Sequence, residues 1–132
     1  MKSYVDAMNK ADVTAMMEMF SRKSGVTSIG DAEISRGWDA IRTESDKIVG
    51  KEGSYKVSIG AIDATPLGAS YALAVSPYTL TAATEKGTVH VEGAMTLVLE
   101  KSEGKWLIVH EHESTKAQVP DASENGDDNG GD

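Results

Sequence analysis

The chain has 132 residues, which fit one domain with a sizeable core and are too few for a two-domain enzyme. Hydrophobic residues make up 39% of the sequence and charged residues 26%, as in soluble globular domains, and no apolar run approaches the roughly 20 residues that span a bilayer. There is no cysteine, which excludes disulfides, thiol nucleophiles and zinc–thiolate sites.

The net charge of −8 at pH 7 is unevenly distributed along the chain. Residues 119–132 contain five acidic residues and no basic one. We therefore expect a folded domain at 1–118 and a disordered acidic tail at 119–132. Because no basic stripe is present to neutralise phosphates, no nucleic-acid partner is expected. Residues 1–12 lack the apolar segment of a signal peptide, so the expected location is cytoplasmic, without a membrane partner.

Residues 2–21 have the pattern of two helices separated by a bend. Asp12 interrupts the pattern and is a suitable N-cap for a second helix that begins at Val13. The methionines of this segment are expected to fill the core rather than to bind a metal. Apolar or small side chains recur at helical spacing at Tyr4, Val5, Met8, Ala11, Ala15, Met16, Met19 and Phe20.

Two short strands and a third helix are expected next. Residues 26–30 and 33–36 have strand character and flank a turn at Asp31. A helical pattern then follows Gly37 and ends near Gly50. Its positions are Trp38, Ile41, Ser45 and Ile48.

From Gly53 onward the hydrophobic period changes to two, which is typical of strands. Three helices followed by a run of antiparallel strands predict an α+β domain with its helices packed on one face of the sheet. The expected long strands are 54–65, 70–84, 88–101 and 105–115, and the turns between them are 66–68, 85–87 and 102–104.

The loop Ser102-Glu103-Gly104 predicts the register of the last hairpin. A three-residue loop that ends in glycine is typical of a type I turn closed by a left-handed residue, which makes Lys101 and Lys105 neighbours. In that register Glu111 lies opposite Met95. One face then contains the core row Met95, Leu97, Leu99, Leu107 and Val109, which continues through Glu111 and Glu113 toward one end of the sheet.

The opposite face of this hairpin is too apolar to be purely solvated. In the predicted register it contains Trp106 and Ile108 beside Val98. Such a patch usually marks a subunit interface, so a homodimer or larger homo-oligomer is expected. The expected interface residues are Trp106, Ile108, His110 and His112.

The sequence resembles the nuclear transport factor 2-like superfamily, and within it the SnoaL-like branch. The resemblance covers residues 1–116 and rests on SYVDAMNKADVTAMMEMFS, VTSIG, ISRGWDAIR and GKWLIVHEHES. The closing strand also resembles the end of the calcium/calmodulin-dependent kinase II association domain. The resemblance implies a cystatin-like, cone-shaped fold, in which a strongly curved antiparallel sheet wraps around the N-terminal helices and leaves a pocket at the open end. Many such domains form dimers through their sheets.

Among the members of this superfamily, ketosteroid isomerase allows the most direct comparison of catalytic residues. Its catalytic tyrosine corresponds to Tyr4, but its carboxylate base corresponds to Ser28. By the predicted register, its protonated aspartate corresponds to Met95, which donates no hydrogen bond. Two of the three catalytic groups are therefore missing, and that mechanism is not expected here.

Other acids on the pocket face are the candidates for chemistry. A carboxyl group at the end of an apolar row has its pKa raised when it is desolvated and then serves as a general base. Glu111, with Tyr4, is the catalytic candidate, and the alternative is a solvated glutamate at the pocket rim. The candidate ligand-binding residues are Trp38, Tyr71, Met95 and Glu113.

The three histidines do not predict a metal site. His110 and His112 lie on one face of a strand, but a metal needs a third ligand, and in the predicted register His90 pairs with Lys116 instead. Neither a metal nor another cofactor is expected.

Two functions remain open at this point. The first is a SnoaL-like pocket protein that binds a small, mainly apolar molecule, with acid–base chemistry of the isomerase, cyclase or dehydratase type. The second is a non-catalytic association module.

Overall fold

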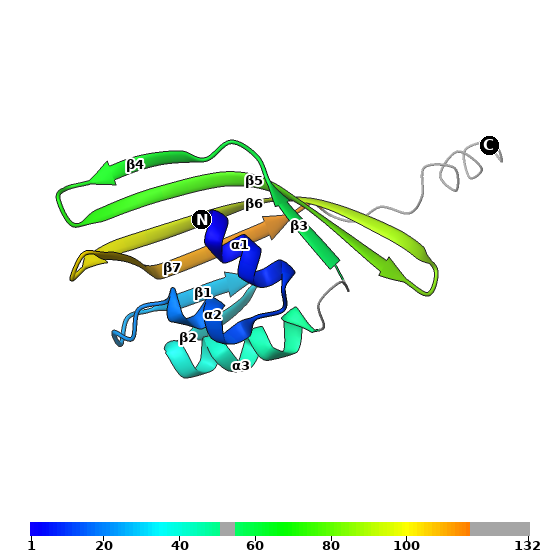
Figure 1. Cartoon of the computed structure of the whole chain (residues 1–132), viewed down its shortest axis with the longest axis horizontal. Helices are drawn as coiled ribbons and strands as arrows, with labels where there is room; N and C mark the ends of the chain where they lie inside the picture. Colours follow the sequence, from blue (N-terminus) through cyan, green and yellow to red (C-terminus); the bar gives the residue numbers. More distant parts are fainter. Residues whose placement is uncertain (51–54, 117–132) are drawn as a thin grey trace.

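Three helices lie on one face of a curved, unclosed, seven-stranded sheet (Figure 1). The computed structural model describes residues 1–50 and 55–116. The predicted α+β class is confirmed, whereas the predicted tail at 119–132 lies outside the described residues. The elements are α1 (Lys2–Asn9), α2 (Val13–Glu18), β1 (Thr27–Gly30), β2 (Glu33–Arg36), α3 (Trp38–Val49), β3 (Tyr55–Ile59), β4 (Asp63–Leu67), β5 (Tyr71–Thr84), β6 (Gly87–Ser102) and β7 (Lys105–Thr115).

The sheet has the strand order β2-β1-β7-β6-β5-β3, and β4 pairs with the remaining part of the β5 edge. All neighbouring strands are antiparallel except β1 and β7, which are parallel. This parallel pair was not predicted from the sequence. It inserts the β1–β2 hairpin from the N-terminal half next to the last strand of the chain.

The predicted helix boundaries are confirmed by the local geometry. Asp12 caps α2, because its Oδ1 accepts a hydrogen bond of 3.0 Å from the backbone N–H of Ala15. α3 begins after Gly37 and ends at Gly50, and both glycines have positive φ angles, of 90° and 66°.

The predicted strand 54–65 is two shorter strands in the structure. β3 ends at Ile59, and the backbone N–H of Gly60 then donates a 2.9 Å hydrogen bond to the carbonyl oxygen of Pro77. Pro66 and Leu67, which were expected to form a turn, belong to β4 instead. The two short strands share the edge of β5 on either side of this contact.

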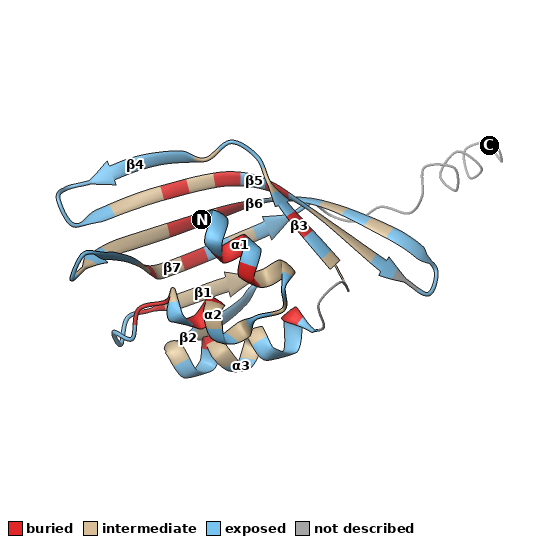
Figure 2. Cartoon of the chain, in the orientation of Figure 1, coloured by how far each residue is buried: buried red, intermediate tan, exposed pale blue. Residues whose placement is uncertain are grey.

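The core lies between the helices and the inner parts of the long strands (Figure 2). The helices contribute Met16 and Met17, and the sheet contributes Met95 and Leu97, all of them almost inaccessible to solvent. The prediction that methionines fill the core is therefore confirmed for these buried residues.

The predicted register of the β6–β7 hairpin is wrong, because the turn is one residue shorter than expected. Ser102 pairs with Lys105, which leaves only Glu103 and Gly104 in the turn. Both have positive φ angles, of 51° and 82°. This geometry is typical of a two-residue type I′ turn, whose twist matches that of the flanking strands.

A β-bulge changes the register a second time. Leu99 pairs with Ile108, whereas Val98 pairs with His110, so Val109 is an extra residue in β7. Beyond the bulge Leu97 pairs with Glu111 and Met95 with Glu113. Glu111 was expected opposite Met95 and is displaced from that partner by two residues. Since this displacement is even, the two glutamates remain on the predicted core face.

The bulge also divides the predicted interface patch. Ile108 pairs with Leu99 on the core face and is only 2% exposed, so it is not available to a partner subunit. Trp106 precedes it by two residues and pairs with Lys101, which places it on the same face of the sheet. His110 and His112 lie on the opposite face. The prediction of one continuous outer patch is therefore wrong.

Asn9, the last residue of α1, binds the backbone of the edge strand β3. Its Nδ2 donates to the carbonyl oxygen of Val57 at 2.9 Å, and its Oδ1 accepts from the N–H of Val57 at 2.7 Å. The side chain therefore satisfies both backbone groups of an edge residue.

We expect Asn9→Ala to lower the free energy of unfolding by about 1–3 kcal/mol, because two half-buried backbone groups lose their partners. Urea denaturation measures this change. Asp6→Ala on the exposed side of α1 is the control, and it should change the stability by less than about 0.5 kcal/mol. Equal stabilities of the two variants would contradict the role of Asn9.

Candidate active site

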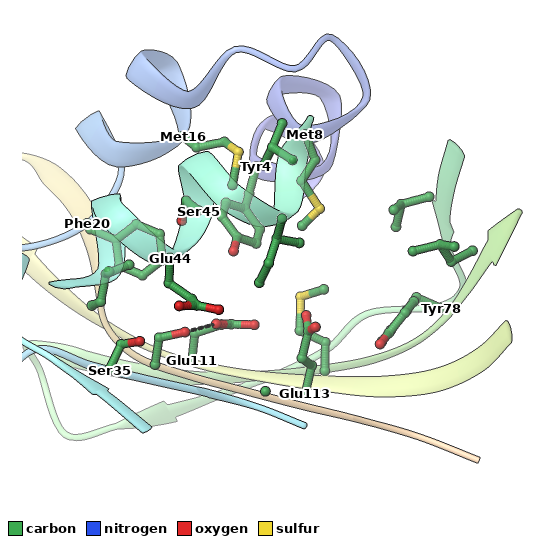
Figure 3. Close-up of a pocket in the computed structure, with 18 of the residues that line it drawn as sticks. Tyr4, Met8, Met16, Phe20, Ser35, Glu44, Ser45, Tyr78, Glu111 and Glu113 are labelled. Carbon is green, nitrogen blue, oxygen red and sulfur yellow. Dashed lines mark hydrogen bonds between the residues drawn. The ribbon is translucent and has the colours of Figure 1, made fainter. Parts of the chain in front are cut away.

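A cavity of about 200 Å³ lies between the helices and the sheet (Figure 3). It is smaller than the pockets of about 300–1,000 Å³ that hold drug-sized molecules. Apolar side chains from α1, α3 and the sheet form most of its wall, and polar side chains gather at one side. The polar lining residues are Tyr4, Ser28, Glu33, Ser35, Glu44, Ser45, Tyr55, Tyr78, Glu111 and Glu113.

Glu111 lies at the base of this cavity and is only 4% exposed. The parallel pairing of β1 with β7 places Ser28 directly beside it. The hydroxyl of Ser28 donates a 2.5 Å hydrogen bond to Oε1 of Glu111, drawn as the dashed line in Figure 3. The carboxyl group is therefore buried with one oxygen held by a neighbouring strand, and the alternative of a solvated rim position does not fit this geometry.

Burial raises the pKa of Glu111 from 4.5 to about 8, and the charge of Glu113 adds to the shift. The pKa of Glu113 is also raised, again mainly by burial. The interaction between the two carboxyl groups raises the pKa of Glu111 further and opposes the rise in the pKa of Glu113. Both carboxyl groups therefore hold a proton more readily than an exposed glutamate does.

Three tyrosines surround this pair of glutamates. Burial, followed by the nearby Glu111 and Glu113, raises the pKa of Tyr4 well above its ordinary value and that of Tyr78 to about 12. The pKa of Tyr55 is raised by burial and by Glu113. All three hydroxyls therefore remain protonated at neutral pH and are available as hydrogen-bond donors.

Tyr78 occupies its position because β6 has a glycine beneath it. A Cβ atom on Gly93 would lie 2.7 Å from Cζ of the Tyr78 ring and 2.5 Å from the carbonyl oxygen of Ser114. Any larger residue at position 93 would therefore displace the ring or the neighbouring strand.

The structure brings together four of the six residues that the sequence suggested for chemistry or ligand binding. Tyr4, Met95, Glu111 and Glu113 line the cavity, whereas Trp38 and Tyr71 are not among the described residues that line it. Helix α3 uses Trp38 for packing, since its Nε1 donates a 3.0 Å hydrogen bond to the carbonyl oxygen of Met17. The hydroxyl of Tyr71, at the start of β5, instead donates a 3.1 Å hydrogen bond to Glu100 on β6.

Several cavity residues were not identified as site candidates from the sequence. Glu44 reaches the cavity from α3, and Figure 3 shows its carboxyl group near the level of Glu111. The helical spacing predicted α3 itself, but not which of its polar positions turns inward. In the sequence comparison Ser28 stands where ketosteroid isomerase has its carboxylate base. Only the parallel β1–β7 pairing reveals the contact of Ser28 with Glu111.

The histidines of β7 lie outside the cavity lining. Nδ1 of His110 is 2.7 Å from Oγ1 of Thr27, and the rings of His110 and His112 meet edge to face at 6.3 Å. Nδ1 of His90, on β6, is 3.3 Å from Oγ1 of Thr81 on the neighbouring strand β5. Within residues 1–50 and 55–116, no group of three potential ligands converges on a metal position.

We expect the buried proton on Glu111 to make stability depend on pH. Between pH 4.5 and about 8 the unfolded chain releases a proton that the folded chain retains, so the free energy of unfolding should decrease as pH rises through this interval. Glu111→Gln should remove this contribution, so that its stability increases relative to the wild type as the pH rises.

Urea denaturation at pH 5, 6, 7 and 8 measures the difference between the two proteins. His110 has a lowered pKa and gives the opposite slope at the acid end, but it is common to both proteins and cancels in the difference. Glu18→Gln, at an exposed position of α2, is the control and should follow the wild type. A stability difference independent of pH would contradict the raised pKa of Glu111.

The curved sheet, the helices on its one face and the cavity between them define the class of cone-shaped α+β domains of the nuclear transport factor 2-like fold. The chain belongs to the SnoaL-like domain family, whose model matches residues 1–118. This confirms the resemblance inferred from the sequence. No curated protein matches the chain.

Solved structures with the same fold carry different descriptions. A nuclear transport factor 2-like superfamily protein from Salmonella enterica is 24% identical, with 90% of this chain and 87% of that chain covered and a TM-score of 0.73. A ketosteroid isomerase-like protein from Erwinia carotovora is 17% identical (89% and 91% covered, TM-score 0.71). The association domain of C. elegans CaMKII is 16% identical (86% and 88% covered, TM-score 0.71). At these identities the similarity establishes the fold alone.

None of the helices in the described part of the chain has the length and apolar character needed to cross a bilayer.

Proposed function

We propose that this chain binds a small, mainly apolar molecule in the cavity and transfers protons to and from it, as an acid–base enzyme of the isomerase, cyclase or dehydratase type. The observation that carries the proposal is the carboxyl pair at the cavity wall, in which Glu111 is buried and Glu113 is half-buried. A general base is most effective when its pKa lies near the working pH, and the pKa of Glu111 is about 8.

The surrounding residues suggest distinct roles in such a reaction. In its ionised form, Glu111 accepts a proton from a carbon atom of the ligand and later returns it. Ser28 holds Oε1 of Glu111 and so fixes the orientation of the carboxyl group. Tyr4 retains its own proton and donates a hydrogen bond to the oxygen on which negative charge develops. This arrangement differs from that of ketosteroid isomerase, because the base is on β7 instead of β1.

Methionine methyl groups provide a direct test of ligand binding. Met8, Met16 and Met95 line the cavity, whereas Met19 is not among its lining residues. With methyl-¹³C-labelled methionine, a small cyclic ketone such as cyclohexanone should shift the three cavity resonances and leave that of Met19 unchanged. Shifts spread over all methionines, or none at saturating ketone, would contradict a binding cavity.

Proton transfer can be tested with the same ketone in D₂O. The base breaks a C–H bond next to the carbonyl group, the proton exchanges with solvent, and a C–D bond forms. We expect the wild type to increase deuterium incorporation about 10²-fold or more over buffer, the usual contribution of general acid–base catalysis. Glu111→Gln should return the rate to that of buffer, and Tyr4→Phe should lower it.

The exposed Glu18→Gln variant is the control for this experiment and should exchange the ketone protons as fast as the wild type. If the ketone binds but the wild type exchanges its protons no faster than buffer, the catalytic part of the proposal is contradicted and ligand binding stands alone.

Self-association is the second candidate function. Leu67 and Tyr71 are large exposed apolar side chains on one face at one end of the long strands, and Trp106, which is 46% exposed, lies at the same end on the other face. Exposed apolar surface of this kind favours an interface with a second copy. The expected contact is therefore this end of the sheet, in place of a continuous patch with His110 and His112.

Light scattering after size-exclusion chromatography should give at least twice the chain mass of 14.0 kDa if this end of the sheet is an interface. Trp106→Glu should then reduce the mass to that of a monomer, because a charge would have to be buried. A wild-type monomer at micromolar concentration would contradict self-association and leave the pocket function unaffected.

A further inference from the structure

We propose that the ligand of the cavity is an organic cation, a protonated amine attached to a small apolar body. This inference rests on the proposed function, since it concerns the same cavity, and it specifies the chemical class of the molecule that binds there.

The first observation is the charge of the cavity wall. Four glutamates line it, and none of its described lining residues is a lysine, arginine or histidine. Buried Glu111 and half-buried Glu113 therefore lie in the wall without a cationic side chain in the cavity lining. Burial raises the pKa of both carboxyl groups, because desolvation disfavours their charged forms, and a cation beside them would favour those forms. A positively charged ligand supplies the counter-ion that the described lining residues do not.

The second observation is the hydroxyl group of Tyr4. The side chain is only 5% exposed, and Figure 3 shows the hydroxyl directed into the cavity, toward the glutamates. No described residue forms a hydrogen bond with it. Its oxygen keeps accessible surface inside the cavity, so a polar group of a ligand can reach and pair with it there. An ammonium N–H donates to a lone pair of this oxygen and another to a glutamate, while the Tyr4 hydroxyl keeps its own proton for donation.

Aromatic rings complete the surroundings of the charge. Tyr55 and Tyr78 line the cavity near Glu113, and the ring of Phe20 meets that of Tyr4 edge to face at 5.8 Å. Cations are attracted to the faces of such rings, most strongly where water is excluded. The remaining wall is apolar and rich in methionine, which adapts to the shape of a hydrocarbon body.

Other ligand classes fit this site less well. A carboxylate or phosphate would add negative charge beside two glutamates. A neutral alcohol or ketone can form hydrogen bonds here but brings no positive charge to a wall that contains four glutamates. A metal ion would need three converging ligands, which the described residues do not provide.

Three probes of similar shape and different charge test the proposal: benzylammonium, benzyl alcohol and benzoate. Binding is measured at pH 7 through the methyl resonances of Met8, Met16 and Met95, in phosphate buffer, because amine buffers would compete for the site. We expect benzylammonium to bind at least about tenfold more tightly than benzyl alcohol, as for hydrogen bonds to charged groups, and benzoate not to bind. This comparison uses the wild-type protein and does not depend on the folding of any variant.

Glu113→Gln tests the origin of the preference. It keeps the shape of the side chain and removes its charge, so it should abolish the tenfold advantage of benzylammonium and change the affinity for benzyl alcohol by less than about twofold. The control is Glu18→Gln, which makes the same change of net charge outside the cavity and should keep the preference.

Two results distinguish this inference from the proposed function. If benzyl alcohol or benzoate binds as tightly as benzylammonium, the preference for a cation is overturned while the binding cavity stands. If none of the three probes, nor cyclohexanone, shifts the cavity methionines, both proposals are overturned.

Discussion

The extra residue at Val109 is the constraint on which the core and the candidate site both depend. Side chains alternate between the faces of a regular strand, so Ile108 and Glu111, three residues apart, would lie on opposite faces. The bulge puts both on the face that the helices cover. Ile108 can therefore join the core, while Glu111 reaches Ser28 and the cavity. One inserted residue thus allows a single strand to supply both an apolar core residue and a buried acid.

A second requirement is that the buried carboxyl groups have partners. The parallel β1–β7 pairing meets part of it, because it brings the Ser28 hydroxyl to Glu111 from a distant part of the sequence. Glu113 lines the same cavity, and burial raises the pKa of both carboxyl groups. Buried titratable groups held in this way are often functional, since their protonation responds to small changes in their surroundings. Acid–base chemistry and recognition of a cation are two uses of the same electrostatic arrangement.

The sequence predicted the α+β class and the three helices, because periodicity and capping are local signals. Glu111 and Glu113 lie on the predicted inner face although the predicted register is wrong, because the shorter turn and the bulge each shift the pairing by one residue and together keep the same face. The sequence did not predict the length of the last turn, the bulge or the β1–β7 pairing, because the residue types are compatible with more than one geometry at these places. Ser102-Glu103-Gly104 is compatible with both a three-residue and a two-residue turn, and nothing in residues 105–115 marks Val109 as the bulge. The pairing of Ser28 with Glu111 joins residues 83 positions apart, beyond the reach of any local pattern.

The amide of Asn9 has a consequence beyond holding α1 against the sheet. β3 is an edge strand, and edge strands present unpaired N–H and C=O groups to which another chain can add a strand. Asn9 occupies both of these groups at Val57, in the middle of the five-residue strand. An incoming strand would have to displace this amide before it could pair along β3. The last residue of α1 therefore disfavours edge-to-edge aggregation through β3.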